Sequence, residues 1–232
     1  MEERLELFTA GTKTFEQSTA GPVVPDTTDL AVLAEAASHC TGCQLYKSAT
    51  QVVFGRGPAA ARVALVGEQP GDQEDLKGQP FVGPAGEVLD RALKEAGVSR
   101  ANLYVTNAVK HFKWEPRGKR RIHQKPNQLE MDACRPWLEA ELRSVHPEVI
   151  VCLGATAAQT LLGPQFRVMK SRGRMMRTRW APWLIATLHP SAILRAADPE
   201  AAEASYRMLL DDLRTVAAHL GVSRPQDSGV RI

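Results

Sequence analysis

Residues 62–71 read RVALVGEQPG, and this stretch decides which fold we expect for the chain. Its apolar run at 63–66 is short and bounded by turn-forming residues, which predicts a strand buried on both faces. A rigid turn rich in glycine and proline, 67–71, follows, and Glu68 and Gln69 protrude from it. Because ligands of open α/β sheets bind at the carboxyl ends of strands, this turn is a candidate binding loop. A surface loop with a solvated glutamate has the same pattern.

The rest of the chain alternates between helices and strands. Continuous apolar runs predict three more strands, at 103–106, 148–153 and 183–188. Helices are expected at 30–37 after an N-cap at Asp29, between Pro84 and Gly97, and at 128–144, 156–162, 190–195 and 199–220. This order predicts an α/β protein, a three-layer α/β/α domain with a central, mainly parallel four-stranded sheet. The domain should span 29–220, between a flexible N-terminal extension, 1–28, and a C-terminal tail, 221–232.

Two segments carry no clear pattern of their own. The basic insert at 111–126, HFKWEPRGKRRIHQKP, shows neither a helical nor a strand period, so we expect an irregular loop there. Pro136 lies inside the predicted helix at 128–144, where a proline should bend the helix or mark its true start.

The composition indicates a soluble globular protein. Of 232 residues, 44% are hydrophobic and 24% are charged. There is no run of 18 apolar residues, and the N-terminus MEERLELF is too acidic for a secretory signal, so we expect a cytoplasmic protein with no membrane partner. The basic residues gather at 110–125 and 167–179, which indicates a phosphate-rich partner, although two solvated basic loops would look alike.

Three polar side chains follow three different predicted strands. Glu68, Asn107 and His189 each come just past the carboxyl end of a strand. Parallel strands present these ends at one edge of the sheet, so we expect the three side chains to gather there.

The four cysteines suggest a metal centre. Disulfides are unusual in a cytoplasmic chain, and Cys40 and Cys43 have the C-x2-C spacing that lets two thiolates hold one centre. Cys134 and Cys152 do not repeat that spacing, as a zinc ribbon would, so scattered ligands of an iron–sulfur cluster fit at least as well. An alternative interpretation is that Cys134 and Cys152 bind no metal and are small hydrophobic residues buried in the core.

Five motifs occur together in one order. They are the C-x2-C with two later cysteines, GEQPG at 67–71, PFVGPAG at 80–86, TN at 106–107 and LHPSAIL at 188–194. In this order the chain resembles the uracil-DNA glycosylase superfamily, and within it the iron–sulfur group called family 4. Two departures, Gln69 where alanine is usual and the insert KRRIHQKP, resemble the UdgX subgroup, in which a histidine of the insert becomes covalently linked to DNA.

The resemblance implies a uracil pocket. Removing uracil requires reading the base and stabilising negative charge on it as it leaves. Phe81 is the expected stacking platform, Asn107 the group that tells uracil from cytosine, and His189 the donor to uracil O2. The pocket is expected to be lined by Gly67, Gln69 and Asp72, the last beside uracil C5.

The resemblance also implies a covalent step and a cofactor. His123 is expected to attack C1′ of the sugar, with Glu68 accepting a hydrogen bond from its other ring nitrogen. The remaining expected groups are the DNA-phosphate contacts Lys119, Arg120, Arg121 and Arg195, and the ligands of a structural 4Fe-4S cluster, Cys40, Cys43, Cys134 and Cys152.

Three functions therefore stay open at this stage. The first is a single-turnover glycosylase that acts as a monomer on uracil-containing DNA, single-stranded or duplex, and releases free uracil. The second is a conventional multiple-turnover glycosylase. The third is a non-catalytic DNA-binding module held together by its metal centre, whose affinity for DNA would not depend on uracil.

Overall fold

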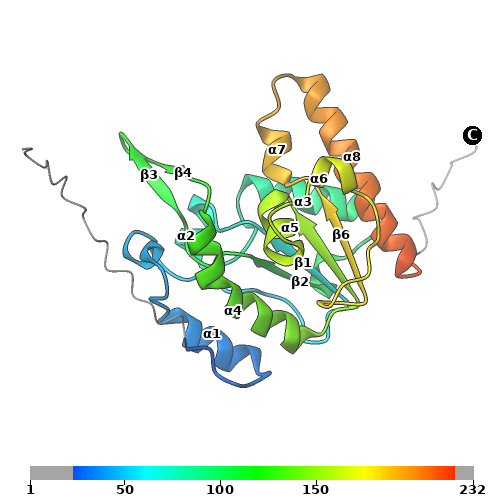
Figure 1. The fold of residues 1–232 in the computed structure, drawn as a ribbon. Coiled ribbons are helices and arrows are strands. Elements are labelled where there is room, and N and C mark those ends of the chain that lie inside the picture. The colour runs from blue at the N-terminus through cyan, green and yellow to red at the C-terminus, as the bar shows by residue number, and fades with distance from the viewer. Residues whose placement is uncertain (1–22, 223–232) are drawn as a thin grey trace, which may run out of the picture.

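A computed structural model of the chain describes residues 23–222 and confirms the expected three-layer α/β/α fold (Figure 1). The central sheet consists of β1 (Val63–Gly67), β2 (Leu103–Asn107), β5 (Val149–Leu153) and β6 (Trp183–Thr187). Its order is β2-β1-β5-β6, and every pairing is parallel. The four predicted strands are therefore confirmed to within one residue at either end.

Helices cover both faces of the sheet (Figure 1). The helices of the described residues are α1 (Leu30–Ser38), α2 (Asp72–Lys77), α3 (Pro84–Glu95), α4 (Gln128–Val145), α5 (Ala155–Leu162), α6 (Val168–Ser171), α7 (Pro190–Leu194) and α8 (Pro199–His219). Two 3-10 turns lie at Gln44–Lys47 and Arg100–Asn102. Helices α3, α7 and α8 pack against one another on one face. Helices α4 and α5 cover the other face, and α1 lies on α4.

The strands are buried on both sides because they have apolar residues on both. In β1, Leu65 belongs to the core under α3 and α8, whereas Val66 belongs to the core under α4 and α5. This explains why the strands show continuous apolar runs rather than alternation.

The order of the strands indicates a candidate binding site between β1 and β5. The chain passes from β1 to β2 on one side and later returns to β5 on the other side of β1. At such a switch point the loops that follow the two strands diverge, so we expect a crevice between them at the carboxyl edge of the sheet.

The basic insert is not an irregular loop, so that expectation was wrong. It forms an antiparallel hairpin of β3 (Trp114–Arg117) and β4 (Arg120–His123), which projects from the body of the protein (Figure 1). Gly118 adopts a φ of 61° in the two-residue turn, where glycine pays no steric penalty.

Three further details differ from, or lie beyond, the sequence-based expectations. The short helix α2 follows the β1 loop and was not predicted. Helix α4 begins at Gln128 with a capping box from Asn127, so Pro136 lies inside the helix and does not mark its start. The predicted terminal extensions lie outside the described residues except for 23–28 and 221–222, which form no helix or strand.

Both edge strands of the main sheet are partly covered. Arg56 forms an isolated antiparallel bridge to Val105 of β2, and Met176 forms another to Leu184 of β6. Across 23–222, no helix combines the length and apolarity that crossing a bilayer requires.

Candidate active site and thiol centre

The floor of the crevice is Gly67, the last residue of β1. A Cβ atom at this position would lie 2.3 Å from Asn107 Oδ1 and 2.6 Å from Cζ of the Phe81 ring. The absence of a side chain at Gly67 therefore lets these two groups approach the strand. Asn107 is buried at the end of β2, and no described group forms a hydrogen bond to its Oδ1. A buried carbonyl oxygen without a partner is costly, which marks Oδ1 as a group that awaits a donor.

Phe81 is held in an unusual backbone conformation. Its φ is 54°, in the left-handed region that bulky residues rarely adopt, and its ring is buried. The ring centroid lies 5.7 Å from that of His189. Glu74 of the unpredicted helix α2 accepts hydrogen bonds from the amides of Gly71, at 3.1 Å, and Gly83, at 2.8 Å. One carboxylate thus ties the β1 loop to the loop that carries Phe81.

His189 caps helix α7, and its contacts define its tautomer. The amide of Ser191 donates to His189 Nδ1 at 3.1 Å, and Ser191 Oγ lies 2.7 Å from the same nitrogen. An Nδ1 that accepts the amide proton leaves the ring proton on Nε2. Burial, and then the positive charges of Arg195 and His123, lower the pKa of His189 to about 4. The imidazole is therefore neutral at pH 7 and can donate a hydrogen bond through Nε2.

Glu68 and His123 face each other across the crevice. His123, the last residue of β4, places Nε2 3.4 Å from Glu68 Oε1. The other carboxylate oxygen of Glu68 accepts a hydrogen bond from Thr156 Oγ1 at the start of α5. The His123 side chain is 47% exposed, so a ligand in the crevice can reach it. Burial lowers the pKa of His123, Glu68 raises it and Arg195 lowers it, with a net lowering.

Arg195 is a positively charged residue that lowers the pKa of both His123 and His189. It is exposed just after α7, and its charge disfavours the protonated forms of His123 and His189. The predicted phosphate contact thus adds to the effect of burial in lowering the pKa values of both histidines.

The side chain of Gln69 is directed differently from the expectation. Its amide nitrogen donates to the carbonyls of Lys113 and Gln124, at 3.1 Å each, and its oxygen accepts from the amide of Lys113 at 3.2 Å. Lys113 and Gln124 flank the hairpin, so Gln69 fixes the base of the hairpin and its side-chain amide is not free to contact uracil.

Arg121 and Asp72 are likewise engaged with each other. The guanidinium of Arg121 contacts Asp72 Oδ1 and the buried Asp75 Oδ2, at 2.6 Å each. These contacts hold β4 against α2, so Arg121 supports the hairpin, and its contact with a DNA phosphate stays a prediction. Lys119 and Arg120, at the tip of the hairpin, are exposed, and their contact with DNA phosphates stays a prediction.

A buried ion pair lies beneath Asn107. Lys110 Nζ contacts Glu141 Oε2 and donates at 2.7 Å to the backbone carbonyl of Asn107 and to Thr106 Oγ1. The side chains of Lys110 and Glu141 are 2% and 0% exposed, so the pair is fully removed from solvent. This pair fixes the end of β2, and nothing in the sequence around Lys110 distinguishes it from a surface lysine.

Three cysteines, Cys40, Cys43 and Cys134, lie in one apolar cluster with Trp137, and we call them the thiol centre. Two N–H groups point at its sulfurs: Trp137 Nε1 at Cys40 Sγ and the amide of Lys110 at Cys134 Sγ, at 3.2 Å each. Burial raises the pKa of Cys134 to about 12. A thiolate there requires a positive partner, and N–H donors aimed at sulfur are a feature of iron–sulfur sites.

Cys152, the fourth predicted ligand, lies in a different core cluster from the thiol centre. It is fully buried in the central strand β5 and faces the core under α4 and α5. His111, which the sequence reasoning missed, is a buried imidazole directly after Lys110, the residue whose amide contacts Cys134. Within 23–222, no three His, Cys, Asp or Glu side chains converge on one metal ion.

Comparisons with known proteins agree with this geometry. The family model described as "Uracil DNA glycosylase superfamily" matches residues 54–214. A protein of Thermotoga maritima named type-4 uracil-DNA glycosylase is 36% identical over 78% of this chain and 90% of its own length. Proteins of the same name from Archaeoglobus fulgidus (38% identical, 67% of this chain, 78% of the relative) and Pyrobaculum aerophilum (36%, 72% and 85%) are also similar. The chain belongs to the uracil DNA glycosylase superfamily.

Proposed function

We propose that this member of the superfamily excises uracil from DNA and then stays attached to the abasic sugar through His123. The observation that carries the excision step is the buried, unpartnered Asn107 Oδ1 beside the Phe81 ring. The observation that supports the attachment is His123, which faces Glu68 within the same crevice.

The Asn107 amide matches one edge of uracil. Its Oδ1 accepts a hydrogen bond from uracil N3–H, and its nitrogen donates to O4. Cytosine presents an acceptor at N3 and a donor at N4, so both contacts would be reversed. A base flipped out of the stack lies against Phe81, with Gly67 leaving the space.

His189 stabilises the leaving base. As the glycosidic bond breaks, negative charge develops on uracil, and the neutral His189 Nε2–H donates to O2. A pKa of about 4 keeps this ring neutral, so it acts by hydrogen bonding rather than as a general acid.

His123 captures the sugar. With Nε2–H directed at Glu68, Nδ1 carries the lone pair and forms a bond to C1′ as the bond from C1′ to uracil N1 breaks. The bonding electrons leave with uracil, and the Nε2 proton passes to Glu68 as the imidazolium becomes neutral. An imidazole joined to C1′ is a poor leaving group, so the protein turns over once and releases free uracil.

The thiol centre would hold a 4Fe-4S cluster, with His111 as the fourth ligand. This assignment is supported by its three thiols, by the N–H groups aimed at two of them, and by the buried imidazole of His111, one residue after Lys110, whose amide is one of these N–H groups. Such a cluster would join the segment after α1 to helix α4 and supply a structural tie.

A denaturing gel with a uracil-containing oligonucleotide tests the proposal. The wild-type protein should give a band that survives SDS and boiling, and uracil-free DNA should give none. His123→Ser should lose the band and release uracil with multiple turnover, because water then captures the sugar.

His219→Ser is the matched control, since His219 Nε2 also lies near a glutamate, 3.2 Å from Glu148 Oε1, at the end of α8. It should behave as wild type. A clean abasic product without a shifted band would overturn the covalent step, and no excision at all would overturn the proposed activity.

A further inference from the structure

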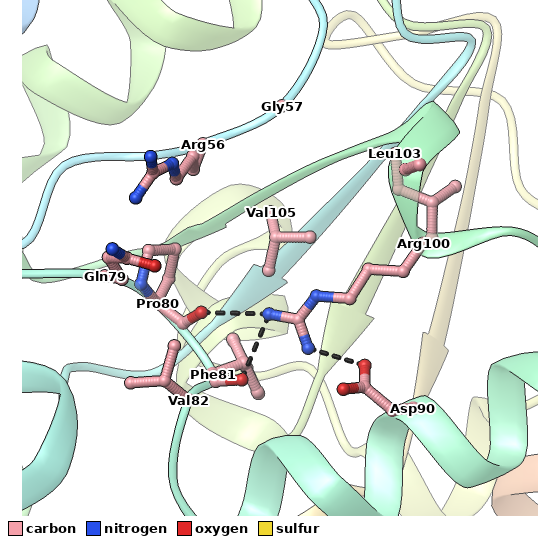
Figure 2. A pocket seen from close by; sticks show the side chains of 11 residues that line it. Arg56, Gly57, Gln79, Pro80, Phe81, Val82, Asp90, Arg100, Leu103 and Val105 are labelled. Atoms are coloured by element: carbon pink, nitrogen blue, oxygen red, sulfur yellow. Dashed lines mark hydrogen bonds and ion pairs between the residues drawn. The ribbon is translucent and has the colours of Figure 1, made fainter.

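A cavity of about 450 Å³ is lined by Phe81, by its loop neighbours and by residues of β2 (Figure 2). Arg100, in the 3-10 turn before β2, extends along this cavity. One of its nitrogens donates to the carbonyls of Pro80 and Phe81, at 3.0 Å each. Another donates to Asp90 Oδ1 of α3 at 2.5 Å. The guanidinium therefore joins the Phe81 loop to the helix that follows it.

The Phe81 backbone needs such a support. A φ of 54° is unfavourable for phenylalanine, and a residue stays there only when its surroundings impose it. Gly86 permits the same geometry from the helix side, because a Cβ there would lie 2.0 Å from the Phe81 carbonyl oxygen. Arg100 holds that oxygen from the cavity side.

We propose that Arg100 is a positioning residue for uracil binding: anchored by Asp90, its guanidinium fixes the carbonyls of Pro80 and Phe81 and so holds the Phe81 ring against the Gly67 floor. The inference rests on the proposed function, because it gives Phe81 the role of base platform. Arg100 touches neither base nor sugar and acts through Phe81 alone.

The geometry requires arginine. A planar guanidinium can bind a carboxylate and two carbonyls at once, because its donors have fixed directions. A lysine ammonium keeps the charge but not this fixed fork. The Arg100 side chain is 30% exposed and borders the cavity, so we expect its variants to fold.

The test measures binding of an oligonucleotide with one 2′-fluoro-2′-deoxyuridine, whose fluorine disfavours the sugar cation so that the base binds without being removed. Arg100→Met should weaken this binding about tenfold relative to uracil-free DNA, the scale of one lost base–aromatic stack. Arg100→Lys should give a smaller loss and serves if the methionine variant does not fold.

A double-mutant cycle separates positioning from general support of the fold. In a Phe81→Leu background, Arg100→Met should add no further loss, because the platform is already gone. Equal losses in both backgrounds, or no loss in either, would overturn the proposal.

Arg62→Met is the matched control. Arg62 also binds a carboxylate, Glu148 Oε2 at 2.7 Å, and a carbonyl, that of Leu220 at 3.4 Å, at the opposite edge of the sheet. It should leave uracil binding unchanged. If the proposed function itself fails, the wild-type protein will show no preference for the uracil analogue, a result distinct from an unaffected Arg100 variant.

Discussion

The space for a base in the proposed pocket depends on Gly67, because this residue has no side chain. In Gly67→Ala, the new methyl group would overlap Asn107 Oδ1 and the Phe81 ring, so one of them must move out of place. We expect the rate of uracil release to fall roughly 10- to 100-fold, the kinetic equivalent of moderate overpacking. Single-turnover excision assays would measure this loss, while affinity for uracil-free DNA should stay the same. An unchanged rate would mean that the base does not bind over Gly67.

Arg195 predicts a pH effect. Its positive charge lowers the pKa of both His123 and His189, so its removal in Arg195→Met should raise both pKa values. A protonated His123 has no lone pair to attack the sugar, and adduct formation in the variant should therefore fail at a higher pH than in wild type. Adduct yield measured from pH 4 to 8 would show the shift of the acid limb. Arg207→Met is a control, because Arg207 lies on the exposed face of α8, and it should leave the pH profile unchanged. A pH profile of Arg195→Met that superimposes on that of wild type would contradict the expectation.

At the scale of elements, the proposed attachment step depends on the β3–β4 hairpin, because β4 carries His123. Gln69→Ala would remove three hydrogen bonds that fix the base of the hairpin, each worth about 1 kcal/mol. The uracil pocket itself stays intact, so we expect the ratio of covalent adduct to free abasic product to fall severalfold while uracil release continues. Gln73→Ala, on the exposed side of α2, is the control. A loss of both products together would show that Gln69 serves the pocket and not the hairpin.

The main sheet could be predicted from sequence, whereas the hairpin could not. Strands such as β1 carry their own signal, because burial on both faces demands a run of apolar residues. The strands of the hairpin are four residues long and mostly polar, and one contains Pro116. Contacts from outside the segment stabilise them, from Gln69, Asp72 and Asp75, and no local pattern reports such contacts.

The candidate site shows the same division. Glu68, Asn107 and His189 could be placed at one edge because parallel strands end together. The thiol centre could not be fully placed, because spacing alone does not reveal which face of a strand a cysteine occupies. Cys152 faces the core under α4 and α5, whereas the other three cysteines lie in the cluster with Trp137. His111 could not be singled out from sequence, because it lies among the basic residues of the insert.

For the whole molecule, the Lys110–Glu141 pair joins the sheet to α4 deep in the core. Lys110→Met would leave the Glu141 carboxylate buried without its cation, and we expect the free energy of unfolding to fall by about 3–5 kcal/mol. Urea denaturation would measure it. Lys110→Met combined with Glu141→Leu should recover part of the loss because no charge is then stranded. A single variant as stable as wild type would show that the pair is not structurally required.

The thiol centre links the N-terminal segment to the rest of the fold. If the thiol centre holds the proposed 4Fe-4S cluster, Cys134→Ala should lose visible absorbance and bound iron and melt at a lower temperature, because the variant lacks one of the proposed ligands. Cys152→Ala should keep both iron and colour, since Cys152 only fills the core. Iron analysis and absorbance spectra decide this, and a colourless Cys152→Ala protein would return Cys152 to the ligand set.

The isolated β-bridges of Arg56 and Met176 affect how closely packed copies of the protein can interact. Each occupies backbone groups on an outer strand, so neither side of the sheet offers a long open ladder to a neighbouring chain. Copies brought close together on one damaged nucleic acid should therefore stay separate particles rather than fuse through shared strands, even at the high local concentration that such a template creates.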